Sequence, residues 1–485
     1  MIVYPNPYIF KELKGEYVFG KCATLSISKK YAHSSEIKLF VELWKNFTGS
    51  IGEIELNIIE NCENNLIISS NRSFLKKENI KEYEYSINCS ENGISLSFNN
   101  VKAMAHGLCT ILQLLEVRET KLSKEKFAVA FCNIFDKPLI AFRGVHICVF
   151  SGMELHFLRR LVRFLGFLKY SHIVIEFWGM LKLDALEELA WKDKAFTKEQ
   201  VKPIIEEAKA LGMEVIPMFN HLGHASLSRA AFGRHVILDQ NPALAPLFEP
   251  NGWTWNIKNP DTLILLKNIR EELIDFFGNG EYFHIGCDEA ESFGMGHLYY
   301  GERKNEILIN YLNTVINELD KKGRRPIMWG DDLLNSADWE KPYIANGRID
   351  KDFNTKELIE KLSKKVIIDD WQYGQIDTEI ETSKCLSSQG LDVIISPWDN
   401  VQGIKSSVET VPKNNLKGII QTTWHHININ YLLSSSVFMW CGIEKMPNSI
   451  MKNNMLFAAA GGFSRKLLPS KDYMLCGWSK EEVVL

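Results

Sequence analysis

The chain has 485 residues, of which 46% are hydrophobic and 24% charged, proportions typical of a water-soluble globular protein. This length predicts two or three domains. The formal net charge of −4, without any basic run, argues against nucleic acid or an anionic membrane as the main partner.

The cysteines and the apolar segments indicate the cellular setting. Ten cysteines are scattered along the chain without a C-x-x-C pair, and several lie inside apolar runs. This pattern favours reduced, buried thiols over disulfides or a cysteine-based zinc site. No stretch reaches 18 apolar residues, and no secretory signal is visible at the amino terminus. We therefore expect a cytoplasmic protein without a membrane-spanning segment.

Residues 1–138 are predicted to form a small α+β domain. Short β-like segments alternate with Asn, Ser and Gly breaks, and apolar positions at helical spacing follow over residues 101–116. A group of strands followed by a helix is typical of an α+β fold. The β-like segments lie at residues 53–59, 66–68, 83–87 and 94–98.

Residues 139–485 are predicted to form a (β/α)8 barrel with a carboxyl-terminal helical segment. Eight apolar runs alternate with helix-like segments, such as the amphipathic stretch 198–211. This alternation is the signature of the barrel. The alternative is an open doubly wound sheet, but no G-x-G-x-x-G or G-x-x-x-x-G-K-[ST] loop follows any of the runs. The runs cover residues 141–149, 171–177, 213–219, 282–286, 325–329, 366–371, 391–397 and 418–424.

Active sites of such barrels lie at the carboxyl-terminal ends of the strands. Each of the last four runs ends in or beside a tryptophan, with carboxylates and histidines between them. Indole faces stack on sugar rings and carboxylates accept bonds from hydroxyls, so this rim predicts a carbohydrate pocket. The candidates at the rim are Glu176, Trp178, Asn220, His221, His224, Asp288, Glu289, Trp329, Asp331, Asp332, Asp370, Trp371, Tyr373, Trp398, Asp399, Trp424, His425 and His426.

Two adjacent carboxylates, Asp288 and Glu289, end the fourth apolar run. Carboxylates at the mouth of a buried strand are costly to desolvate unless they are neutralised, hydrogen-bonded or used in chemistry. The alternative is a helix cap, because Asp-Glu after glycine commonly opens a helix.

The same residues resemble a known family. The stretch H-I-G-C-D-E at 284–289 resembles the H-x-G-G-D-E signature of glycoside hydrolase family 20, the β-N-acetylhexosaminidases. Further segments resemble family motifs in the family's order: H-G-L-C-T-I-L-Q-L-L at 106–115, F-R-G-V at 142–145, V-I-P-M-F-N-H-L-G-H-A at 215–225 and W-G-D-D at 329–332. The resemblance implies a hydrolase that takes a small carbohydrate as its substrate.

The resemblance implies a role for each of these residues. Glu289 would be the general acid and base, and Asp288 would orient the 2-acetamido group whose oxygen attacks C1 to form an oxazolinium intermediate. Arg143 would bind sugar hydroxyls as a forked donor, with a buried structural salt bridge as the rival interpretation. His224 would support the acid. The remaining substrate contacts would come from Glu176, Trp329, Trp371, Tyr373, Trp398, Asp399 and Trp424.

Several positions depart from the family pattern. Cys148 stands where the family usually has Asp, and Trp398 stands where the family has a tyrosine that binds the acetamide, so that Tyr373 becomes a candidate for this contact. The pairs His221/His224 and His425/His426 lack a clear third ligand, and therefore neither a metal nor a cofactor is expected.

Two other functions stay open at this point. The protein could bind carbohydrate without catalysis, although such a binder would not need an acid pair. It could also be a retaining glycosidase with a carboxylate nucleophile. The choice between GlcNAc and GalNAc, the aglycone and the oligomeric state do not follow from the sequence.

Overall fold

The computed structural model describes residues 3–20, 22–48, 53–59, 65–69, 82–118, 126–226, 236–347, 355–376, 379–425, 427–445 and 462–469. Within these ranges, no helix combines the length and the apolar character needed to cross a membrane.

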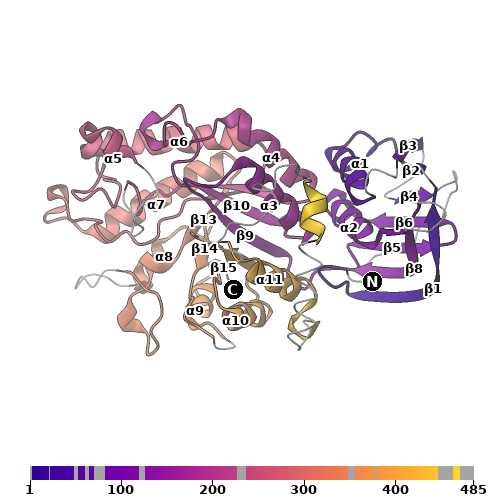
Figure 1. Ribbon diagram of the computed structural model, residues 1–485. Helices are drawn as coiled ribbons and strands as arrows, with labels where there is room; N and C mark the ends of the chain where they lie inside the picture. Colours follow the sequence, from indigo (N-terminus) through magenta and orange to yellow (C-terminus); the bar gives the residue numbers. More distant parts are fainter. Residues whose placement is uncertain are drawn as a thin grey trace.

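The amino-terminal part of the chain folds into an eight-stranded mixed sheet (Figure 1). The strands follow the order β1-β8-β5-β6-β4-β2-β3, and β7 pairs with β8. All neighbouring pairs are antiparallel except β2 and β3, which are parallel. The strands are β1 (Ile9–Phe19), β2 (Cys22–Ser28), β3 (Glu53–Ile59), β4 (Asn65–Ser69), β5 (Tyr85–Ser90), β6 (Gly93–Phe98), β7 (Glu116–Arg118) and β8 (Lys126–Asp136).

Two helices, α1 (Ser35–Phe47) and α2 (Val101–Leu114), pack between this sheet and the barrel. Asn100 caps α2 by accepting a hydrogen bond from the backbone of Ala103 at 2.9 Å. The sheet and its helices confirm the predicted α+β fold of this region.

The second part of the chain is a closed parallel barrel of eight strands, which confirms the predicted (β/α)8 fold. Each of the eight apolar runs contains one strand, and the pairing of β9 with β10 and with β16 closes the barrel. The strands are β9 (Phe142–Val149), β10 (His172–Phe177), β11 (Glu214–Met218), β12 (Tyr282–His284), β13 (Arg325–Trp329), β14 (Ile367–Asp370), β15 (Asp392–Ile395) and β16 (Gly418–Thr422).

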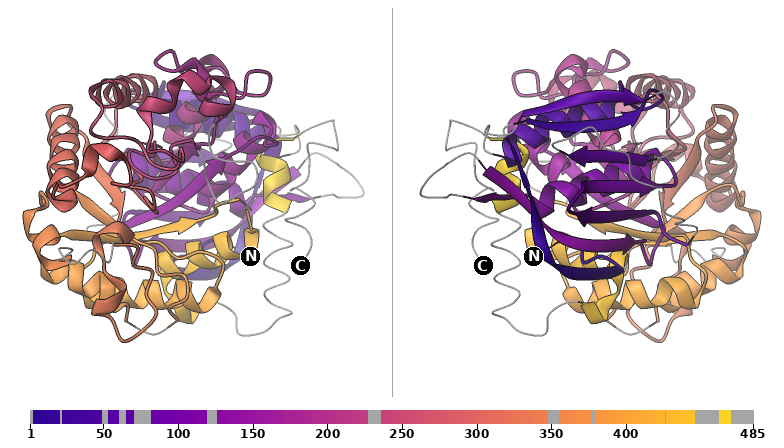
Figure 2. Two further views of the ribbon diagram at one scale, coloured as in Figure 1. Left: turned by 90° about the vertical axis from the view of Figure 1, so that its left-hand side faces the viewer. Right: turned by 90° about the vertical axis from the view of Figure 1, so that its right-hand side faces the viewer.

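Helices follow the barrel strands and surround them, as Figure 2 shows. They are α3 (Leu155–Phe167), α4 (Lys198–Ala210), α5 (Ile237–Gln240), α6 (Pro260–Phe277), α7 (Lys304–Lys321), α8 (Thr355–Lys361), α9 (Glu381–Ser388), α10 (Val401–Lys413) and α11 (Ile429–Cys441). Short 3-10 helices lie in the connections: η1 (Glu187–Leu189), η2 (Pro242–Leu247), η3 (His297–Tyr299), η4 (Asp331–Leu333), η5 (Ser336–Asp338) and η6 (Ile443–Lys445).

A buried ion pair joins the sheet to the base of the barrel. Asp136, the last residue of β8, lies 2.9 Å from Nζ of Lys169, and both side chains are fully buried. Tyr85 and Trp440 also donate hydrogen bonds to the Asp136 carboxylate, at 2.5 and 2.8 Å. We propose that residues 1–138 and 139–485 form the two domains, because the chain leaves the sheet at Asp136 and enters the barrel at β9.

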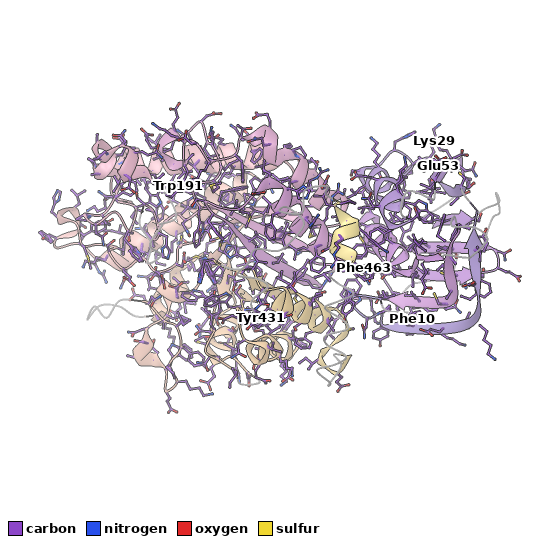
Figure 3. The ribbon with its side chains drawn as sticks, in the orientation of Figure 1. Phe10, Lys29, Glu53, Trp191, Tyr431 and Phe463 are labelled. Atoms are coloured by element: carbon purple, nitrogen blue, oxygen red, sulfur yellow. The ribbon has the colours of Figure 1, made fainter. Side chains whose placement is uncertain are left out.

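A short helical segment near the end of the chain packs where the two parts meet. Figure 3 shows Phe463 on this segment, between the amino-terminal helices and the barrel. Its ring centroid lies 6.2 Å from that of Phe47 in α1 and 5.5 Å from that of Phe167 in α3.

Candidate active site

Two loops lie side by side at the mouth of the barrel, one after β11 and one after β12. A Cβ atom on Gly223 would lie 2.0 Å from the backbone oxygen of Asp288. A Cβ atom on Gly286, whose φ is 64°, would lie 1.7 Å from Oδ1 of Asn220. Only glycine allows this approach at both positions. This close contact fixes the acid-bearing loop against the segment that follows β11.

Asp288 and Glu289 lie in this loop, and neither of them caps a helix. Residues 285–290 have no regular secondary structure, and the next helix along the chain, η3, begins at His297. The helix-cap alternative is therefore excluded. The Asp288 side chain is 4% exposed and the Glu289 side chain 14%, so Glu289 is the more accessible of the two carboxylates.

His224 lies between the two carboxylates. Its Nε2 atom is 3.1 Å from Oε2 of Glu289 and 3.4 Å from Oδ2 of Asp288. Trp253 packs beside the His224 ring, with 5.2 Å between ring centroids, and donates a hydrogen bond of 2.5 Å to the backbone oxygen of Glu289. His224 thus contacts the Glu289 side chain directly, as its predicted supporting role requires. The role itself stays a prediction.

Asp331, the first residue of η4 just after β13, holds the backbone of Glu289 in place. Its Oδ2 atom accepts hydrogen bonds from the Glu289 N–H at 3.0 Å and from Nδ2 of Asn346 at 2.8 Å. Its Oδ1 atom accepts a hydrogen bond from Nε1 of Trp371 at 2.9 Å. Burial, followed by the negative charge of Asp288, raises the pKa of Asp331 to about 6.

Backbone strain is concentrated at this mouth. Of the six non-glycine residues with positive φ in the described part of the chain, four lie here: His224 (53°), Cys287 (72°), Glu289 (47°) and Trp424 (47°). A left-handed backbone costs about 1–2 kcal/mol for a residue with a side chain. Tertiary contacts must hold these residues in place, as is common at functional sites.

The predicted aromatic residues form one continuous wall beside the acids. The Tyr373 ring lies 5.1 Å from Trp371 and 5.4 Å from Trp398, and its hydroxyl accepts a hydrogen bond of 2.6 Å from Nε1 of Trp424. Trp329 lies 5.6 Å from Trp424 and is only 1% exposed, so it forms the floor of the wall. Trp371, Trp398 and Trp424 remain partly exposed.

The prediction that Arg143 points into the site is wrong. Arg143 is the second residue of β9 and lies at the opposite end of the barrel. Its guanidinium donates hydrogen bonds to the backbone oxygens of Ile140, Ala141 and Lys169, at 2.9, 3.0 and 3.0 Å, and stacks over Trp440. Burial lowers its pKa to about 10. Its role is structural, although backbone carbonyls take the place of the salt bridge considered from the sequence.

Glu176 lies in a buried cluster. Its Oε1 atom accepts a hydrogen bond of 2.9 Å from Nδ2 of Asn220, and its Oε2 atom lies 3.2 Å from Nε2 of His146. Cys148 completes the cluster at 3.6 Å from the same oxygen. The predicted contact between Glu176 and a sugar hydroxyl stays a prediction. His146 was missed from the sequence, although the alternation H-x-C on the first barrel strand signals two side chains on one face.

The other weak candidates are spread along the rim. Asp332 accepts a hydrogen bond of 3.0 Å from the backbone N–H of Ala290, and Asp399 is exposed after β15. His221 is fully buried, with Nδ1 2.6 Å from the backbone oxygen of Phe219. His426 lies outside the described residues. The contact of Asp399 with substrate stays a prediction.

A (β/α)8 barrel with adjacent carboxylates and an aromatic wall at its mouth has the layout of a barrel glycosidase. Comparison with known proteins agrees with this layout. Residues 177–414, from the end of β10 through α10, match the catalytic domain of glycosyl hydrolase family 20. The matched part includes Asp288 and Glu289.

Curated relatives share part of the sequence, and solved structures share the fold. The chain is 21% identical over 277 residues to lacto-N-biosidase of Bifidobacterium bifidum, covering 54% of this chain and 23% of that protein. It is 26% identical over 249 residues to β-hexosaminidase subunit A1 of Dictyostelium discoideum, covering 46% and 44%. The chain thus spans less than half the length of these two relatives. The structure of a GH20 exo-β-N-acetylglucosaminidase from Vibrio harveyi, in complex with N-acetylglucosamine, shares the fold with a TM-score of 0.68 and 16% identity, covering 95% of this chain and 78% of that one.

Proposed function

We propose that the protein hydrolyses terminal β-linked N-acetylhexosamine, GlcNAc or GalNAc, with retention of configuration. The observation that supports this best is the contact of His224 with both Asp288 and Glu289 beside an aromatic wall. Two adjacent carboxylates cannot attack a sugar from opposite faces. They suit a mechanism in which the substrate supplies its own nucleophile.

Glu289 is the general acid in this proposal. Its side chain is the more exposed of the pair and can reach the glycosidic oxygen of a bound sugar. It donates its proton as the C1–O bond breaks. In the second step it takes a proton from the water that opens the oxazolinium ring.

Asp288 holds the acetamido group. Its buried carboxylate accepts the N–H of the acetamide, so the carbonyl oxygen is aimed at C1 and the positive charge that forms on the ring is stabilised. The Tyr373 hydroxyl accepts the Trp424 indole N–H and keeps its own proton. We propose that the Tyr373 hydroxyl donates a hydrogen bond to the acetamide oxygen, with its proton staying on the tyrosine, and that Trp329, Trp371 and Trp424 pack against the sugar.

A panel of substrates tests the proposal. The purified protein should hydrolyse aryl β-GlcNAc or β-GalNAc glycosides and leave aryl β-glucosides, which have no acetamide, untouched. A thiazoline that imitates the cyclised intermediate should inhibit it, and NMR should show the β-anomer as the first product. Hydrolysis of β-glucosides without thiazoline inhibition would instead indicate a carboxylate nucleophile, and binding without turnover would indicate a carbohydrate-binding protein.

We also propose that the protein works in the cytoplasm. The eight cysteines in the described ranges are all free, and five of them are buried, as expected in a reducing compartment. Fractionation of the native host with a cytoplasmic marker enzyme would test this location.

A further inference from the structure

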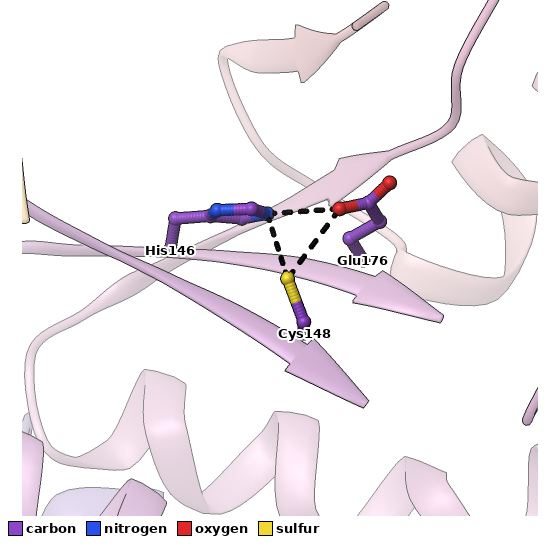
Figure 4. Close-up of side chains that lie close together, drawn as sticks. All are labelled: His146, Cys148 and Glu176. Atoms are coloured by element: carbon purple, nitrogen blue, oxygen red, sulfur yellow. Dashed lines mark hydrogen bonds and ion pairs between the residues drawn. The ribbon is translucent and has the colours of Figure 1, made fainter. Parts of the chain in front are cut away.

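Three side chains of types that can bind a metal ion meet inside the barrel below the aromatic wall. Figure 4 shows them on two neighbouring strands: His146 and Cys148 on β9 and Glu176 on β10. His146 and Cys148 are two residues apart and project from the same side of their strand. Cys148 is paired in register with Glu176, so all three side chains converge. All three are buried, unlike the exposed acidic clusters that are common on protein surfaces.

The distances between the three donor atoms match those of a tetrahedral zinc site. They are 3.2 Å from Nε2 of His146 to Oε2 of Glu176, 3.6 Å from Sγ of Cys148 to that oxygen, and 3.7 Å from Sγ to Nε2. Ordinary zinc bond lengths with tetrahedral angles require about 3.3–3.5, 3.5–3.7 and 3.5–3.6 Å for these pairs. The donor atoms therefore already stand within about 0.2 Å of the required spacing.

The donor types select the class of ion. Thiolate, imidazole and carboxylate together suit Zn²⁺ and its relatives, whereas Mg²⁺ and Ca²⁺ prefer oxygen atoms alone. A divalent ion would be neutralised by one thiolate and one carboxylate, which suits a buried position. Asn220 donates to the second oxygen of Glu176 at 2.9 Å and orients the carboxylate, as outer partners of metal ligands commonly do.

We infer that His146, Cys148 and Glu176 bind one zinc-type divalent ion. The three protein ligands leave a fourth tetrahedral position for water. Ring centroids of Trp424 and Trp329 lie 5.0 and 5.8 Å from that of His146, so the ion sits beneath the aromatic wall and ties the ends of β9 and β10 together. The proposed hydrolysis uses the acid pair and the acetamide, so the inference does not depend on it.

Cobalt(II) provides a direct spectroscopic test. The full-length protein, stripped with a chelator and dialysed against Co²⁺, should bind one ion with the ultraviolet thiolate-to-cobalt band and a higher melting temperature. Zn²⁺ should displace the cobalt and remove the band. Absence of the band in the wild-type protein would overturn the inference and leave a hydrogen-bonded cluster.

Variants separate this site from other thiols. Cys148→Ser should lose the band while keeping the circular dichroism of the wild type. Cys109→Ser, at a buried cysteine of α2, should keep the band and serves as the matched control. Asn220→Ala should bind Co²⁺ about 10–100-fold more weakly, the usual effect of losing an outer partner. An equal band in Cys148→Ser and the wild type would contradict the assignment.

Discussion

Nε2 of His224 lies 3.1 Å from Oε2 of Glu289, and this contact joins the loop after β11 to the loop after β12. The same ring reaches Asp288 at 3.4 Å, so one side chain positions both proposed catalytic carboxylates. It does so from a left-handed backbone (φ 53°), which shows that the contact is maintained against the local preference of the chain.

Replacing His224 should impair the acid without removing it. His224→Asn is the informative variant because asparagine tolerates a left-handed backbone. We expect kcat/KM to fall about 10²-fold, the usual effect of a misplaced catalytic group. The loss should be larger for substrates with poor leaving groups, because these depend on proton donation. The exposed His33, in the turn before α1, provides the control, and His33→Asn should stay near wild type. An equal loss in both variants would contradict the assignment.

The close contact between the loops after β11 and β12 predicts the effect of a single added methyl group. Gly223→Ala would place Cβ 2.0 Å from the backbone oxygen of Asp288, so the acid-bearing loop has to move. A displacement of this kind should lower kcat/KM by at least about 10²-fold. Gly374→Ala, at a rim position with no atom within 4 Å of the new Cβ, should leave kcat/KM unchanged. Full activity in Gly223→Ala would show that this loop contact does not position the acids.

Asp331 should make stability depend on pH. Its folded pKa of about 6 lies above its ordinary value of 3.8, so the folded protein binds this proton more tightly than the unfolded chain. Protonation of Asp331 therefore stabilises the folded state fully below about pH 4, and this stabilisation is lost as the pH rises through 6. It amounts to at most about 3 kcal/mol. Urea unfolding of wild type and Asp331→Asn between pH 4 and 7 measures it. As the pH rises from 4 to 7, the wild type should lose unfolding free energy relative to Asp331→Asn. A difference between the two proteins that does not change with pH would refute the prediction.

The two carboxylates should respond differently to the leaving group. Glu289→Gln should slow substrates with poor leaving groups by about 10²–10⁴-fold and activated aryl glycosides much less. Asp288→Asn should slow both and weaken thiazoline binding, because it removes charge stabilisation of the cyclising acetamide. The measurement is kcat/KM for both variants on both substrates. Equal losses for Glu289→Gln, or wild-type activity for Asp288→Asn, would show that the roles are assigned wrongly.

The barrel and the acid pair could be predicted because each depends on local sequence. Every barrel strand lies in a continuous apolar run, which a strand buried on both faces requires. Gly286 and the two acids stand together in one short motif. By contrast, Arg143 was placed in the site by resemblance alone. Its position at the start of a strand already indicated the opposite end of the barrel.

What the sequence could not provide is contact between distant segments. The hydrogen bond from the Glu289 backbone to Asp331 joins residues 42 positions apart, and nothing in the W-G-D-D stretch indicates it. Likewise, Cys148 faces Glu176 only because of the register between β9 and β10, which does not follow from the sequence of either strand.

The nucleophile is the central claim, and fluorination of the substrate tests it most directly. Aryl β-glycosides whose N-acetyl group carries none, one, two or three fluorine atoms differ in the nucleophilicity of the carbonyl oxygen and little in size. If the acetamide attacks C1, kcat/KM of the wild type should fall steeply and regularly with each fluorine. In Asp288→Asn, kcat/KM should depend less on the number of fluorine atoms. A kcat/KM that does not change along the series would contradict substrate assistance and would indicate an enzyme carboxylate as the nucleophile.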